Sequence, residues 1–212
     1  MKKSNFITAI LIVFSATQLA FSQGITGVKV GVKGGVNFSN LTSDDNNSNK
    51  VLTGVNFGLF AKLPITKSFA IQPEVYFITK GSEITYNNVF VDGTGKFELN
   101  YIEVPLLAVI NLTNNINFQV GPYASYLVSS KVKNVTNVNF NFEDNIDSGD
   151  FNKFDTGVIA GFGFDGKSLG FGVRYNLGLI TVGKEKNYNG TTYTFPNSKN
   201  GVINLYLSYS IL

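Results

Sequence analysis

The stretch Leu169–Leu177 reads LGFGVRYNL, and a large apolar residue occupies every second position along it. The positions between them are small or polar, and one of them is Arg174, the single arginine of the chain. An alternation of period two indicates a β-strand whose two faces meet different surroundings. We therefore expect a strand here, with one face in an apolar environment and the other in a polar one.

The same alternation recurs about eight times after the N-terminal region. The stretches cover residues 28–38, 54–63, 69–77, 101–110, 116–126, 154–164, 169–177 and 203–211. Most are about ten residues long, the length that a tilted strand needs to cross the hydrocarbon core of a bilayer. The sequence predicts an all-β domain, an eight-stranded antiparallel up-and-down transmembrane β-barrel.

The connections between these stretches alternate in length. Short turns are expected near residues 64–68, 111–115 and 165–168. Long polar loops are expected at residues 39–51, 81–96, 129–153 and 183–199. Outer-membrane barrels have short periplasmic turns and longer extracellular loops. We therefore expect the long loops outside the cell.

The composition of the two faces predicts which one points inward. The apolar faces carry bulky residues, whereas the polar faces interleave glycine with Lys, Glu, Gln and Asn. A small barrel has little interior volume, so glycine alternating with long polar side chains fits its inside. Glycine on the outside of a soluble barrel would only weaken the strands. Aromatic residues of the apolar faces fall near the predicted strand ends, as in the girdles of membrane barrels: Phe38, Phe69, Phe118, Tyr126, Phe154, Phe164, Phe171 and Tyr209.

The N-terminus resembles a secretory signal. It has a basic start at Lys2 and Lys3, an apolar stretch over residues 6–14, and small residues at Ala20 and Ser22. We expect a signal peptide of residues 1–22, cleaved after Ser22, followed by one barrel domain of residues 23–212 in the bacterial outer membrane. Removal of the signal would lower the net charge from +3 to +1, which does not favour nucleic acid as a partner.

The chain contains no Cys and no His. This excludes a disulfide framework, a thiol nucleophile, a lipoprotein anchor on a processed cysteine and a Ser-His-Asp triad. Residues Gly161, Gly163 and Gly166 match the dinucleotide fingerprint, but the next stretch alternates as a strand where that fold requires a helix. The acidic loops lack the spacing of a calcium-binding loop. We expect a protein that is not an enzyme, with no cofactor and no metal.

Charged residues on the polar faces predict a network inside the barrel. Arg174, Glu74 and Glu103 each lie in the middle of a predicted strand, and in a ring of eight the third strand lies across from the seventh. A buried charge without a partner is costly, so these three should be paired. Further polar-face residues that complete the network are expected to be Gln72, Tyr101, Gln119, Tyr123 and Asn176. The network would either fill the lumen as a plug or line a narrow pore.

Four short motifs together resemble the PorT-like outer-membrane β-barrel family, whose members are small barrels of the OmpA and OmpX kind. They are IQPE at residues 71–74, YIEVP at 101–105, GPY at 121–123 and RY at 174–175, after a signal that ends in Ser-Gln. The resemblance implies an eight-stranded barrel with Glu74, Glu103 and Arg174 facing the lumen. The chain departs from the usual pattern because it ends in Leu212 rather than an aromatic residue.

Three functions remain open at this point. The first is a structural or surface-interaction protein, embedded in outer-membrane lipid, whose long loops contact an extracellular or secretion-system protein, because loops on a rigid scaffold commonly carry recognition. The second is a narrow channel or a component of a protein-secretion assembly. The third is a soluble lipocalin-like carrier.

Overall fold

The computed structural model describes residues 27–42, 49–88, 91–136, 142–144, 152–183, 185–188, 191–194 and 198–211. The predicted signal peptide, the acidic residues Asp44, Asp45, Asp147 and Asp150, and Leu212 lie outside these ranges. Within them, no helix is long and apolar enough to cross a membrane.

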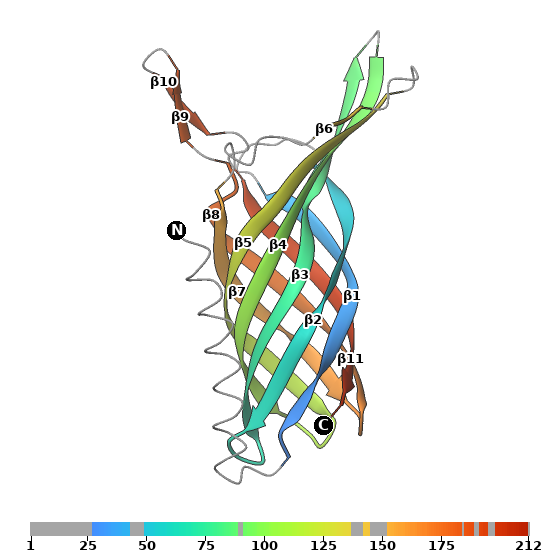
Figure 1. Cartoon of the computed structure of the whole chain (residues 1–212), viewed down its shortest axis with the longest axis vertical. Coiled ribbons are helices and arrows are strands. Elements are labelled where there is room, and N and C mark those ends of the chain that lie inside the picture. Colours follow the sequence, from blue (N-terminus) through green and yellow to red (C-terminus); the bar gives the residue numbers. More distant parts are fainter. Residues whose placement is uncertain are drawn as a thin grey trace.

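Eight strands of the described residues form a closed antiparallel barrel (Figure 1). In ring order these strands are β1 (Lys29–Thr42), β2 (Asn49–Pro64), β3 (Phe69–Asn88), β4 (Val91–Asn111), β5 (Ile116–Thr136), β7 (Phe154–Asp165), β8 (Leu169–Thr181) and β11 (Lys199–Ser210). The ring closes where β1 pairs with β11, with Val36 opposite Leu205. The prediction of an eight-stranded up-and-down barrel is confirmed.

Three short strands lie outside the ring. β6 (Phe142–Asp144) pairs with the end of β5, and β9 (Glu185–Tyr188) forms a separate hairpin with β10 (Thr191–Thr194). All three lie at the same end of the molecule, at the top of Figure 1.

The short turns define the opposite end. They span residues 65–68, 112–115 and 166–168, and each is closed by backbone hydrogen bonds such as the 2.9 Å bond from Ile65 N to Phe69 O. The C-terminal end of β11 also lies at this end (Figure 1). Outer-membrane barrels carry their short turns on the periplasmic side. The end with the short turns is therefore called the periplasmic end, and the opposite end the extracellular end.

The wall of the barrel is apolar outside and mostly polar inside. Along β8, Phe171, Val173 and Tyr175 are exposed on the outer face, whereas Arg174 and Asn176 are buried between them. On the neighbouring β11, Leu207 is 67% exposed and Tyr206 is buried. A soluble carrier would have a polar outer face in contact with water. The apolar outer face seen here fits a barrel surrounded by lipid.

Aromatic side chains on the outer face pair across neighbouring strands. Phe164 of β7 stacks on Phe171 of β8 with ring centroids 5.1 Å apart, close to the periplasmic turns. Tyr126 of β5 meets Phe154 of β7 at 5.2 Å, toward the other end. Such pairs add to the apolar surface that each strand presents to lipid.

The inner wall is crowded enough to require glycine. A Cβ atom placed on Gly35, an inward-facing position of β1, would lie 2.0 Å from the carbonyl oxygen of Leu205. The adjacent Gly34 occupies an outward-facing position, and the nearest atom to its added Cβ is 3.6 Å away. The glycines of the polar face therefore let neighbouring strands and long side chains share a narrow interior.

Three strands continue well beyond the predicted ends. β3 and β4 stay paired as far as Asn88 and Val91, and β5 continues to Thr136. The prediction of a long loop at residues 81–96 is therefore wrong, since all but two of these residues are in strands, and the loop predicted at 129–153 begins as strand. Above the membrane neither face of a strand needs to be apolar, so the alternation that reveals a strand within lipid is absent there.

Candidate functional site

Arg174 of β8 and Glu74 of β3 form an ion pair across the lumen. Arg174 Nη1 lies 2.7 Å from Glu74 Oε2, and Nη2 lies 2.9 Å from Oε1. Lys33 of β1 also donates to Glu74, and Gln119 of β5 accepts a 2.7 Å hydrogen bond from Arg174 Nε. The ring of Tyr206 lies near both cations, 4.3 Å from Lys33 Nζ and 4.6 Å from Arg174 Cζ. Five strands therefore converge on this group, here called the lower network.

A second group, here called the upper network, is centred on Lys80 of β3. Its Nζ lies 2.5 Å from Glu103 Oε2 and 2.9 Å from Asp155 Oδ2. Glu103 Oε1 accepts hydrogen bonds of 2.6 Å from the Tyr76 hydroxyl and 2.9 Å from Asn176 Nδ2. Both carboxylates are buried, so this single ammonium offsets two buried negative charges.

Among the described residues, the ion pairs inside the barrel contain four cations and four anions. The cations are Lys33, Lys62, Lys80 and Arg174, and the anions are Glu74, Glu103, Asp155 and Asp165. Burial of an ion costs several kcal/mol unless a partner and hydrogen bonds compensate. This balance explains how a barrel interior can hold so many charges.

The eight residues expected in the lumen are all buried inside the barrel, but they divide between the two networks. The lower network contains Glu74, Arg174, Gln119 and also Gln72, whose Nε2 donates to Glu74. The upper network contains Glu103, Asn176 and Tyr123, whose hydroxyl donates to Asp155. The Tyr101 ring faces Lys80 Nζ at 5.1 Å. Glu103 is thus paired with Lys80 rather than with Arg174.

Sequence reasoning missed the partners of these residues. Lys80 lies beyond the expected end of the third strand at residue 77, although it has the same parity as Gln72 and Glu74 and would be found by extending the alternation. Lys33 and Asp155 lie on polar faces of the predicted strands, yet the period of a strand does not say which side chains meet across a barrel.

An apolar cluster that was not predicted lies inside the barrel, toward the extracellular end. It comprises Leu41, Tyr76, Ile78, Leu99, Tyr101, Leu127, Val182 and Val202, all buried. Seven of these residues belong to strands of the ring, and Val182 directly follows β8. The cluster packs around the upper network, since Leu99 is opposite Lys80 in the ladder and the Tyr76 hydroxyl donates to Glu103.

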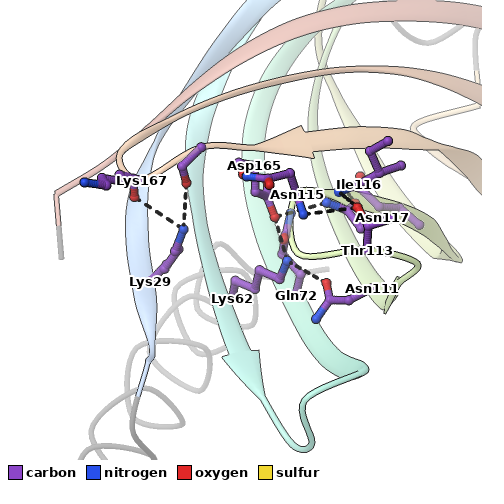
Figure 2. Close-up of polar contacts among 12 residues, drawn as sticks. Lys29, Lys62, Gln72, Asn111, Thr113, Asn115, Ile116, Asn117, Asp165 and Lys167 are labelled. Atoms are coloured by element: carbon purple, nitrogen blue, oxygen red, sulfur yellow. Dashed lines mark hydrogen bonds and ion pairs between the residues drawn. The ribbon is translucent and has the colours of Figure 1, made fainter.

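The periplasmic mouth is open by comparison. A small cavity of about 20 Å³ lies below the lower network, next to Lys33, Gln119 and Tyr206, with room for about one water molecule. Below it lies a basin of about 530 Å³. Figure 2 shows Lys62 at this mouth, 2.6 Å from Asp165 Oδ2 and 3.3 Å from Asn111 Oδ1.

The polar groups of the lumen bind one another. Its carboxylates are all held by cations and amides, and no nucleophile lies beside a free base in either network. No group of three or more acidic residues in the described ranges could hold a metal ion. The arrangement can stabilise the barrel and block its axis.

The chain is similar to several solved structures at low sequence identity. Three solved structures of similar extent are those of Ail, the attachment invasion locus protein of Yersinia pestis, Neisserial surface protein A, and OprG from Pseudomonas aeruginosa. Ail is 13% identical, with 86% of this chain and 98% of that chain covered and a TM-score of 0.46. The Neisserial protein is 12% identical, with 87% of this chain and 99% of that chain covered and a TM-score of 0.49. OprG is 12% identical, with 89% of this chain and 95% of that chain covered and a TM-score of 0.40.

A search among curated protein sequences finds no match. The family model described as "Outer membrane protein beta-barrel domain" matches residues 18–183. Those residues include seven of the eight strands of the closed ring, from β1 to β8. The chain belongs to the outer membrane protein β-barrel domain family.

Proposed function

We propose that this protein is a non-enzymatic outer-membrane barrel that contacts a partner protein outside the cell through the strands that project beyond its rim. The observation that carries the proposal is the contrast between the two parts of the molecule. The lumen is filled by paired charges and an apolar cluster, whereas β3, β4 and β5 continue past the barrel (Figure 1).

The projecting part is built as a sheet rather than as separate loops. Glu83 of β3 pairs with Lys96 of β4 in the ladder, and their side chains form an ion pair of 2.7 Å. Beyond β5, the short strand β6 adds to the same sheet through Lys133 and Glu143. The ladder holds the backbone of this sheet on a rigid barrel, which favours recognition of a protein surface.

We also propose that the protein is related to the PorT-like family. The motifs that carry this resemblance include Glu74, Glu103 and Arg174, which lie in the lumen networks. Common lumen residues support a common scaffold. We propose that any role in secretion lies on the projecting sheet rather than in the charged interior.

Shortening the β3–β4 hairpin tests the proposal. Residues 84–95 are replaced by Asn-Gly. This tight turn joins Glu83 directly to Lys96, its partner in the ladder. A matched control shortens the separate β9–β10 hairpin by replacing residues 186–193 with Asn-Gly between Glu185 and Thr194. Heat-modifiable migration in gels reports whether each barrel folds.

We expect the first variant to fold and to lose surface binding by intact cells, measured as adhesion to immobilised proteins and as cross-linking to neighbouring surface proteins. The control variant should retain both. If the first variant folds and leaves every surface-binding and fitness phenotype intact, the projecting sheet is not the interaction site and the proposal fails.

A further inference from the structure

The basin at the periplasmic mouth has no role in the filled lumen or in the projecting sheet. It measures about 530 Å³ and opens to the periplasm between the three short turns. Its volume lies within the range of ligand-binding clefts. We propose that this basin binds an acidic peptide segment, one that presents two or more carboxylates from the periplasmic side.

Positive charge dominates the lining of the basin. The charged residues that line it are Lys29, Lys62, Lys67, Lys167 and one acid, Asp165. Asp165 is already engaged, because its Oδ2 accepts hydrogen bonds of 2.6 Å from Lys62 Nζ and 3.0 Å from Asn117 Nδ2. Three ammonium groups therefore remain without a carboxylate partner among the lining residues, and they favour an anionic ligand.

Part of this lining is held in place before any ligand arrives. Lys29 Nζ donates to the carbonyl oxygens of Gly166 at 3.2 Å and Lys167 at 3.4 Å, as Figure 2 shows for Lys29 at the β7–β8 turn. On the facing side, Asn111 Nδ2 donates to the carbonyl oxygen of Lys67 at 3.0 Å. Both turns that carry the free lysines are thus fixed, which lowers the cost of ordering them on binding.

The position of the basin favours a soluble peptide over a membrane lipid. It is lined by residues of the lumen face and of the turns, including Lys62 and Asn117, which are both buried. Lipid surrounds the outer wall, where Phe164 and Phe171 are exposed at this end of the barrel. A lipid headgroup would have to leave the outer wall and pass under the turns to reach the basin.

Fluorescence anisotropy of labelled hexaglutamate tests the proposal, with hexaglutamine as the neutral probe. The mature barrel is prepared in phosphatidylcholine nanodiscs at low salt. The test variant is K67Q/K167Q, because both side chains line the basin and are exposed. The matched control is K153Q/K199Q, which removes the same charge from two exposed lysines at the extracellular end.

We expect hexaglutamate to bind the wild type and hexaglutamine not to bind. K67Q/K167Q should weaken hexaglutamate binding about fivefold or more, K153Q/K199Q should leave it within about twofold, and salt near 0.5 M should abolish it. Heat-modifiable migration confirms that each barrel is folded, so a loss of binding reports the basin.

Three outcomes would overturn the proposal. The first is no binding of hexaglutamate by the folded wild type at low salt. The second is equal weakening by both double variants, which would indicate an effect of net charge alone. The third is binding of soluble short-chain phosphatidylglycerol, lost in K67Q/K167Q, without binding of hexaglutamate, which would make the basin a lipid site. None of these bears on the projecting sheet, so this inference and the proposed function can fail separately.

Discussion

Glu74 and Arg174 are one hundred residues apart in the chain, yet their side chains form two hydrogen bonds of 2.7 and 2.9 Å inside the barrel. They reach each other because β3 and β8 are separated by four steps in a ring of eight strands and so lie on opposite sides of the lumen. The width of the lumen is thus matched to one glutamate and one arginine.

Replacing Arg174 by methionine should destabilise the barrel by about 3 kcal/mol, because Glu74 stays buried and keeps only Lys33 as a cation. The triple variant K33M/E74Q/R174M should recover much of this loss, since it leaves neither Glu74 nor Lys33 as an unpaired buried charge. The chain has no Trp, so urea unfolding in lipid vesicles is followed by far-ultraviolet circular dichroism. Equal stability of the single variant and the wild type would contradict the pairing.

Changing Lys80 to methionine should cost much more folding stability than the same change at Lys62. Lys80 is fully buried between Glu103 and Asp155, so K80M should cost about 3 to 5 kcal/mol or prevent folding. Lys62 pairs with Asp165 at the mouth, where the Asp165 side chain is 30% exposed, so K62M should cost about 1 kcal/mol or less. Unfolding midpoints measure the difference. If K80M alone fails to fold, K80M/E103Q/D155N serves as the rescue variant, because it also removes the charge of both carboxylates that Lys80 neutralises.

Gly34 and Gly35 offer the same substitution on opposite faces of β1. Alanine at Gly35 would place its Cβ 2.0 Å from the Leu205 carbonyl oxygen, so G35A should separate β1 from β11 and cost about 2 kcal/mol or more. G34A meets nothing closer than 3.6 Å and should be neutral or stabilising by about 0.5 kcal/mol. The fraction of folded protein in gels after refolding gives the comparison, and similar yields for both would refute the crowding of the inner wall.

Planar-bilayer recording should show no regular current steps for the wild type, because paired charges and the apolar cluster occupy the axis. Steps whose size changes in R174A or E103A would instead show that ions pass between these residues. L99A opens space in the apolar cluster. The same recording with this variant shows whether the apolar cluster alone blocks the passage of ions through the lumen.

The sequence alone predicts the ring well, because lipid and lumen impose opposite demands on alternate residues. Above the membrane the prediction fails, as it does for Gly81 to Asn88, which form the end of β3 but were expected in a loop. The inward apolar residue Ile78 was also unexpected, since it follows the expected end of the third strand and breaks the polar face.

The pairing within the lumen could be predicted only in part. Arg174 stands out because it is the single arginine, and its position on the seventh strand places it across from Glu74 on the third. The pairing of Glu103 with Lys80 depends instead on how far neighbouring strands are shifted along each other. The register of β3 and β4, for example, sets Tyr76 opposite Glu103. Stagger is a property of the closed ring and leaves no mark in one strand's sequence.

The pairing of β1 with β11 has a consequence for assembly. Until Val36 and Leu205 come together, the sheet is open, and Glu74 on β3 has no means of reaching Arg174 on β8. Closure of the ring and neutralisation of its charges are therefore one event. An unclosed chain would expose bare ions to the hydrocarbon phase, where unsatisfied polar groups are most costly, so closure must be completed while the nascent interior is still in contact with water.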